Sequence, residues 1–179
     1  MRRTLGTLSV AALLLALPAN PHAAKTLDIY FIDVEGGQST LVVTPAGQTL
    51  LVDAGFAGAG DRDPNRILAA ARDAHVDRID FLLITHFHID HDGGVPALAD
   101  RIPIGTFIDY GEPRQTSRGV TVPFAAYAAA RSKGKHLVPS PGDRLPLRGV
   151  DVDVVSAGGA LITKPLAGGR RREPRLRCI

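Results

Sequence analysis

The sequence is poor in cysteine, in aromatic residues and in long apolar runs. Its 179 residues include one Cys, no Trp and 5% aromatic residues. One Cys excludes a disulfide framework and a Cys-rich zinc module, because each of these needs several thiols. The apolar run near the N-terminus is too short to span a bilayer as a stable helix. Glycine and proline are abundant, with 19 and 13 residues, which favours a fold with many turns over a helix bundle.

The charge of the chain is concentrated at its two ends. The formal net charge is +3, but residues 25–169 contain 14 basic and 17 acidic side chains, a net charge of −3. A mildly acidic body argues against a nucleic-acid-binding face, which needs a basic surface. We therefore expect no specific nucleic-acid surface in the body of the protein.

The two ends of the chain have their own patterns. Arg2 and Arg3 precede the apolar run Leu8–Leu17, and small residues follow it. This is typical of a secretory signal peptide over residues 1–24, so we expect export to the periplasm or the extracellular space, with no membrane span after cleavage. An uncleaved membrane anchor is the alternative. Residues 170–179 are rich in Arg, which predicts a basic, disordered or out-of-frame tail, or else a tail that binds nucleic acid or anionic lipid.

Between these ends, strand and helix patterns interleave. Periodicity predicts helices over residues 63–74, 95–100 and 124–133, and strands over 27–34, 39–44, 49–52, 79–85 and 106–110, with further short strands within 138–155. Asp63 is expected to cap the first helix, with Pro64 at its first position. The first three strands form an antiparallel meander, and the apolar fourth strand is of the kind that is buried on both faces. We therefore predict one domain over residues 25–169, of the α/β (α+β) class with a mixed sheet.

A cluster of metal-ligand residues follows the apolar strand. His86, His88, Asp90 and His91 lie within six positions, and Gly93-Gly94 comes next. Two His at i and i+2 point about 200° apart on a helix but to the same side of an extended chain, so they can converge on one ion only from a strand end or a loop. The two glycines are expected to supply backbone freedom for the turn. Imidazole with carboxylate suits zinc, iron or manganese, and a surface loop that happens to be rich in His is the alternative.

This order of residues resembles a known family. His86-x-His88-x-Asp90-His91 resembles the signature of the metallo-β-lactamase superfamily, and Leu51–Gly55 resembles its upstream Asp motif. Residues 31–53 and 85–94 look most similar to the branch that includes the hydrolase domain of competence proteins for DNA uptake. The first motif of that branch usually reads Asp-Val-Gly-Gln-Gly-Asp, and residues 33–38 of this chain, Asp-Val-Glu-Gly-Gly-Gln, depart from it.

The resemblance implies the amino-terminal part of an αββα sandwich with a metal site at the edge of its sheets. By analogy, His86 and His88 would bind a first Zn²⁺, and Asp90 and His91 a second, with Mn²⁺ or Fe as substitutes. Asp90 would also be the catalytic carboxylate. Asp53 would lie behind the ligands and orient one of them, or else be an ordinary turn carboxylate. The implied reaction is attack of a metal-bound hydroxide on an ester or phosphodiester of a small-molecule or phosphodiester substrate.

The family needs further ligands later in the chain, and this sequence offers few. His136 is the one His after His91, and we expect a surface residue there rather than a ligand. The candidate bridging carboxylates are Asp143, Asp151 and Asp153, which have the context of a turn and of the wet face of a strand. We therefore expect an incomplete site that holds zinc weakly, a chain truncated where its composition changes, and a sheet face left uncovered. The alternative is a non-catalytic remnant, or a metal- or ligand-binding module, that keeps the first half of the fold.

Overall fold

A computed structural model describes residues 26–166 of the chain, so the predicted signal peptide (1–24) and basic tail (170–179) lie outside the described residues. Eight strands are present: β1 (Asp28–Phe31), β2 (Thr40–Val43), β3 (Thr49–Val52), β4 (Ile79–Leu83), β5 (Ile104–Ile108), β6 (Lys135–Leu137), β7 (Ser156–Ala157) and β8 (Ala160–Leu161). The helices are α1 (Arg62–Asp73), α2 (Ile89–Asp92), α3 (Val95–Ala99) and α4 (Arg118–Arg131), with a 3-10 turn η1 (Ala59–Asp61) before α1.

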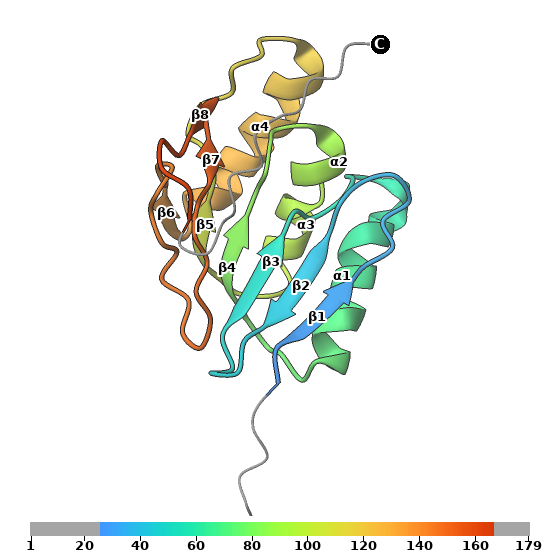
Figure 1. The fold of residues 1–179 in the computed structure, drawn as a ribbon. Helices are drawn as coiled ribbons and strands as arrows, with labels where there is room; N and C mark the ends of the chain where they lie inside the picture. The colour runs from blue at the N-terminus through green and yellow to red at the C-terminus, as the bar shows by residue number, and fades with distance from the viewer. Residues whose placement is uncertain (1–25, 167–179) are drawn as a thin grey trace, which may run out of the picture.

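The main sheet is mixed and follows the order of the sequence, β1-β2-β3-β4-β5-β6 (Figure 1). The first three strands pair antiparallel through short turns, as predicted. From β3 onward all pairs are parallel, and Leu82 of β4 lies between Leu51 of β3 and Phe107 of β5. The predicted α/β class with a mixed sheet is confirmed. Because β3, β4 and β5 are parallel, their carboxyl ends share one edge of the sheet.

Two helix starts differ from the prediction. Helix α1 begins at Arg62 with Asp61 at its N-cap, so Asp63 is not the cap. The Asp63 carboxylate is buried instead, and it accepts a hydrogen bond from the Phe56 backbone N–H at 2.8 Å. Helix α4 begins at Arg118, six residues earlier than expected, and contains Pro123 in its second turn. Proline lacks an N–H and usually starts a helix, which is why the sequence pattern placed the start after it.

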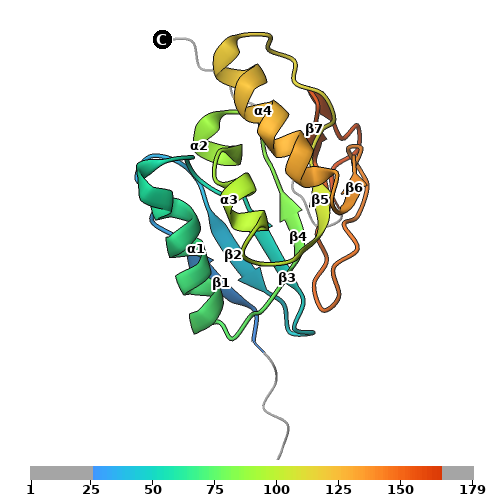
Figure 2. The same cartoon turned by 180° about the vertical axis from the view of Figure 1, so that it is seen from behind.

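All four helices cover one face of the sheet, as the view from behind shows (Figure 2). The core there joins the sheet to inward-facing residues of the helices; Ile67 and Ala71 of α1, Leu98 of α3 and Tyr127 of α4 are all buried. Ile67 and Ala71 stand four residues apart and so share one face of α1, as the sequence pattern predicted. This apolar layer fixes the helices against the sheet edge that carries the His cluster.

The opposite face of the sheet is covered over β3, β4 and β5 by the segment 138–155. Leu145 and Leu147 of this segment pack against Leu50, Phe81 and Ile108 of the sheet. The expectation of an uncovered sheet face is therefore wrong for these strands. The short strands expected within 138–155 are not formed either, since that segment holds an isolated bridge between Arg144 and Asp153 and covers the sheet by an irregular path. On the edge strand β1 the face does remain open, and Phe31 is 85% exposed.

None of the helices within residues 26–166 is long and apolar enough to cross a membrane.

Candidate metal centre

The predicted metal ligands lie at the carboxyl end of β4, in the centre of the sheet. The chain leaves β4 at Leu83, passes through a bent loop over residues 84–88, where the His88 N–H donates to the His86 carbonyl at 3.2 Å, and enters the one-turn helix α2. Asp53 comes directly after the neighbouring strand β3, and its backbone N–H donates to the Leu83 carbonyl at 2.8 Å. The parallel pairing of β3 and β4 thus brings Asp53 beside a motif more than 30 residues away in the sequence.

Asp53 holds this loop through its side chain. The carboxylate is fully buried and accepts hydrogen bonds from the Thr85 backbone N–H at 2.8 Å and the Thr85 hydroxyl at 2.7 Å. Its Oδ2 also lies 2.8 Å from Nδ1 of His91. A carboxylate only accepts hydrogen bonds, so Nδ1 carries the proton and Nε2 of His91 keeps its lone pair for a ligand. Asp53 adopts a left-handed backbone with φ of 58°, which is uncommon for a residue with a side chain.

The three imidazoles of the motif pack against one another. The ring centroid of His86 lies 3.8 Å from that of His91 and 4.7 Å from that of His88. The carboxylate of Asp90 lies 3.5 Å from Nε2 of His91. Burial lowers the pKa of His86, and the neighbouring His91 and His88 lower it further. The neutral imidazole that results is the form that binds a metal ion.

The donor set fits zinc, although its atoms do not converge on one point. Nε2 of His88 lies 3.1 Å from Oε1 of Gln115. Within residues 26–166, no group of three or more His, Cys, Asp or Glu side chains stands ready to hold a metal ion. The chemistry nevertheless suits Zn²⁺, since neutral imidazoles and a carboxylate lie together and a buried carboxylate orients one imidazole from behind.

Backbone contacts lock the motif against two other loops. The carbonyl of His91 accepts from the Ala54 N–H at 2.8 Å, and the carbonyl of Asp90 accepts from the Gln38 N–H at 3.2 Å. A Cβ on Gly37 would lie 2.5 Å from that Asp90 carbonyl oxygen, so only glycine allows this approach. The β1–β2 loop, the end of β3 and the motif therefore form one packed unit.

The two glycines after the motif serve this packing rather than the turn. Gly93 and Gly94 have φ of −63° and −75°, which any residue can adopt. A Cβ on Gly93 would overlap the Ile89 carbonyl oxygen, and one on Gly94 would overlap that of Ala54. The expectation that they supply backbone freedom is therefore wrong, and what they supply is space.

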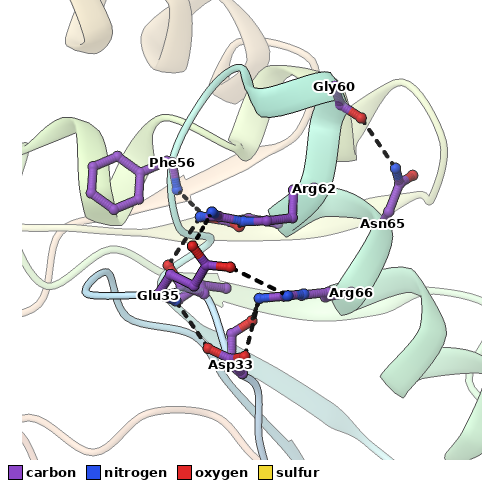
Figure 3. Close-up of polar contacts among 9 residues, drawn as sticks. Asp33, Glu35, Phe56, Gly60, Arg62, Asn65 and Arg66 are labelled. Carbon is purple, nitrogen blue, oxygen red and sulfur yellow. Dashed lines mark hydrogen bonds and ion pairs between the residues drawn. The ribbon is translucent and has the colours of Figure 1, made fainter.

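A surface network fixes the β1–β2 loop to α1 (Figure 3). Arg62 pairs with Glu35 at 2.6 Å and with Asp63 at 2.6 Å, and Arg66 pairs with Asp33 at 3.1 Å. Glu35 holds a left-handed backbone with φ of 51° at the position where the competence branch usually has glycine. The acidic side chain that departs from the branch motif is thus tied down by two arginines of α1.

Asp92 is a buried group that the sequence reading passed over. Its side chain is fully buried, and neither carboxylate oxygen has a hydrogen-bond partner in the described part of the chain. Burial raises the pKa of Asp92 to about 7. The sequence did not distinguish Asp92 from Asp90. Both are acidic residues of a four-residue helix, which is too short for a periodic pattern to show which side chain faces inward.

The other candidate ligands do not join the motif. His136 lies in β6 and is exposed, as expected, and its Nε2 lies 2.9 Å from Oδ1 of Asp109. Asp143 accepts from the Ser140 N–H at 2.7 Å within a turn, as its context predicted. Asp151 and Asp153 are exposed and both pair with the same arginine, Arg144. None of the three Asp is near enough to the motif to form a metal group with it in the described structure.

A cleft opens beside the motif, and two of its residues gave no sequence signal. It has a volume of about 470 Å³ and is lined by Thr85, His86, Tyr110, Arg114 and the β7–β8 hairpin. A smaller adjoining pocket contains His86, His88, Arg114 and Gln115. Arg114 and Gln115 belong to the loop between β5 and α4, whose residues form no motif that sequence reasoning could recognise.

Fold and site together define an α/β protein with a candidate metal centre at the carboxyl edge of a mixed sheet. The family description of the metallo-beta-lactamase superfamily matches residues 32–168. The chain therefore belongs to the metallo-β-lactamase superfamily. One curated protein, an atrochrysone carboxyl ACP thioesterase of Aspergillus fumigatus, is 36% identical over 62 residues, which cover 35% of this chain and 19% of that protein.

Several solved metallo-β-lactamases are similar to parts of this chain. A Cronobacter sakazakii enzyme, the S60 mutant of its HARLDQ motif, covers 69% of this chain at 17% identity and a TM-score of 0.49. SMB-1 covers 70% at 16% identity and a TM-score of 0.48, and MEM-A1 from a soil metagenome library covers 70% at 18% identity and 0.45. The chain spans 47–48% of the length of these three structures.

Proposed function

We propose that this chain carries the metal-binding motif of a hydrolase that cleaves ester or phosphodiester bonds. The proposal rests on the position of the buried Asp53. Its Oδ2 lies 2.8 Å from Nδ1 of His91, and the His86 ring packs against the same imidazole. A carboxylate behind a ligating imidazole orients it and raises its basicity, which is the usual support of a metal site. Membership of the metallo-β-lactamase superfamily supports the same reading.

The proposed ligands are His86, His88, Asp90 and His91, holding one or two Zn²⁺, with Mn²⁺ or Fe as substitutes. Zinc would supply a Lewis acid at the scissile bond and lower the pKa of a water molecule. The chain itself contributes orientation and proton transfer. Asp53 keeps the proton of His91 on Nδ1, and Oδ2 of Asp90, a partly exposed carboxylate oxygen, would accept a proton from the attacking water.

Two observations point to different substrates within this class. The relative named as a thioesterase favours an acyl substrate, so that an ester or thioester is cleaved. The motif similarity to competence proteins favours a phosphodiester instead. We favour the acyl substrate, because residues 33–38 depart from the competence motif and Glu35 is built into the α1 network.

The test uses the full chain, stripped of metal and reloaded with zinc, manganese or iron. Metal per chain is measured by elemental analysis, and turnover is measured with 4-nitrophenyl acetate and bis(4-nitrophenyl) phosphate. We expect weak zinc binding, saturated only with zinc in excess, and zinc-dependent turnover of the acyl ester. His88→Ala and Asp90→Ala should each lower turnover by about a hundredfold or more, because they remove proposed ligands.

A matched control is available at the far end of α1. His75 is an exposed histidine with φ of 54°, and His75→Asn keeps a side chain that tolerates this backbone. It should bind zinc and turn over substrate like the parent chain. Equal turnover in His88→Ala, Asp90→Ala and the parent would contradict the proposal.

The second candidate is a module that binds a metal or ligand without turnover. The observation that favours it is that the donors within residues 26–166 do not converge as they stand. Stoichiometric zinc that depends on His88, with no turnover of either substrate, would support this module against the hydrolase.

We also propose that the protein is exported, on the basis of the sequence pattern of residues 1–24. A fusion of residues 1–30 to a reporter that is active only outside the cytoplasm tests this. Active reporter that is lost on replacing the apolar run with charged residues is the expected result.

A further inference from the structure

The cleft beside the motif has a wall that the proposed chemistry does not use. His86 and Thr85 form one side, and the loop between β5 and α4 forms another with Tyr110 and Arg114. Arg114 and His86 also line the adjoining pocket. Arg114 therefore lines both spaces that border the proposed metal ligands.

Arg114 has no carboxylate partner among the residues that the structure describes. The acid closest to it in sequence, Glu112, lies 4.0 Å from Arg131 instead. Arg62 and Arg66 of α1, by contrast, are engaged by acids of the β1–β2 loop. An arginine that lines a cleft and keeps its five N–H donors free is suited to bind an anionic group of a ligand.

The opposite wall is shaped to accommodate this guanidinium. Gly158 belongs to the turn of the β7–β8 hairpin, and a Cβ built on it would lie 3.0 Å from an Nη atom of Arg114. Gly158 also has a positive φ of 54°. The turn therefore leaves room for Arg114 to extend along the cleft between the hairpin and His86.

We propose that Arg114 is an anion-binding residue of the substrate site, and that the substrate is an ester or thioester with a second, negatively charged group, a carboxylate or phosphate. This rests on the proposed hydrolase function. In the reaction, the oxygen of water bonds to the acyl carbon and the carbon–oxygen or carbon–sulfur bond breaks. The leaving alcohol or thiol keeps the bonding electrons and takes one proton, and the new acid releases its proton at neutral pH. Arg114 takes no part in bond making; it positions the substrate through its charged group.

The test compares two esters that share a leaving group. One is neutral, 4-nitrophenyl acetate, and the other carries a carboxylate, the mono-4-nitrophenyl ester of succinic acid. With the zinc-loaded full chain, Arg114→Ala should lower the preference for the succinate ester, as the ratio of the two kcat/KM values, by about tenfold, the loss of one charge-assisted hydrogen bond. Arg114→Lys should restore part of it. Arg118→Ala, an exposed arginine outside both spaces, is the control and should leave the ratio unchanged.

A binding measurement separates this inference from the hydrolase function. Succinate and acetate are titrated into the parent chain and Arg114→Ala by calorimetry, with and without zinc. Succinate should bind the parent about tenfold more tightly than Arg114→Ala, while the weaker acetate should not distinguish them. Arg114-dependent succinate binding without any turnover would reject the hydrolase and keep the anion site. Turnover with an unchanged ester ratio, or succinate binding that ignores Arg114, would overturn the anion site.

Discussion

The parallel strands β4 and β5 each end in a polar cluster, and the two clusters differ in what they leave free. At the end of β5, the buried Asp109 accepts from the Tyr127 hydroxyl at 2.6 Å, from Arg131 at 2.9 Å and from the Gly111 N–H at 2.7 Å, and His136 lies at 2.9 Å. Both carboxylate oxygens of Asp109 are therefore engaged in hydrogen bonds within the protein. At the end of β4, the Asp53 carboxylate binds Nδ1 of His91. The His86 and His88 rings of this cluster pack against each other and are not gathered around one carboxylate as the groups at Asp109 are.

The difference separates a cluster that satisfies its own hydrogen bonds from the proposed metal-binding cluster. The Asp109 cluster joins β5, β6 and α4 and satisfies itself, so it stabilises the fold. The His86 cluster keeps donors available at the mouth of a cleft. Sequence composition alone does not separate the two, because both combine His with Asp. What separates them is whether the hydrogen-bonding capacity is consumed within the protein.

The largest effect is expected from breaking the closed cluster. Asp109→Ala leaves Arg131, His136 and the buried Tyr127 hydroxyl without their acceptor, and should lower the free energy of unfolding by about 3–5 kcal/mol. Chemical denaturation checks this. The control is Asp100→Ala, which removes an exposed ion pair with Lys133 and should cost below about 1 kcal/mol. Similar losses in the two variants would show that the cluster is not a structural hub.

A smaller and different effect is expected from Asp53→Asn in the open cluster. The amide keeps the shape but no longer accepts from Nδ1 of His91 as a carboxylate does, so zinc affinity should fall by about ten- to a hundredfold. Competition with a chromophoric chelator measures the affinity. A matched change in the Asp109 cluster, His136→Asn in β6, should leave zinc affinity as it is. Equal zinc affinity in the parent and Asp53→Asn would remove the proposed orienting role.

The two buried carboxyls Asp109 and Asp92 should give opposite pH dependences. Burial alone would raise the pKa of Asp109, but hydrogen bonds from Tyr127, His136, Gly111 and Arg131 outweigh it and lower the pKa. Its contribution to stability is therefore present above the unfolded value of 3.8 and lost as the pH falls through the lower folded pKa. Denaturation of the parent and of Asp109→Asn between pH 2 and 5 (a range of about three units) should show this part of the acid sensitivity only in the parent.

The smallest effect is expected at Asp92, and it has the other sign. Because burial raises its pKa from 3.8 to about 7, the folded chain binds a proton that the unfolded chain releases, and stability falls as the pH rises through this window. Asp92→Asn in the metal-free chain should remove that slope and raise the free energy of unfolding by about 1–2 kcal/mol above pH 7. Thermal melts at both ends of the window measure it. A slope that persists in Asp92→Asn would assign it to another group.

Much of the sheet could be predicted from local patterns, and much of its surroundings could not. The meander of β1, β2 and β3 follows from alternating residues and short Gly-containing turns, and β4 from its unbroken apolar run. The cover of the second sheet face was missed because the sequence indicated short strands within 138–155, whereas that segment crosses the sheet by an irregular path and packs Leu145 and Leu147 on it. The start of α4 was misplaced because Pro123 is unusual inside a helix.

The site divides in the same way. His86, His88, Asp90 and His91 could be proposed as ligands because they are close in sequence, and Asp53 could be proposed behind them because a strand end precedes it. The partner of His136 could not be found, since Asp109 lies 27 residues earlier and meets it only through the parallel pairing of β5 and β6. Arg114 was missed for a similar reason, because its position in the cleft depends on how the β7–β8 hairpin folds back.

The left-handed backbone at Asp53 restricts which amino acids can occupy that position. Gly, Asn and Asp adopt such a φ most readily, so steric demands favour these three, although Glu35 and His75 show that other residues are tolerated. Of these, only Asp accepts every hydrogen bond that Thr85 and His91 donate. A library of all substitutions at residue 53 should therefore give different results in two selections. Gly and Asn should be recovered when variants are selected for folding, and Asp alone when they are selected for metal binding.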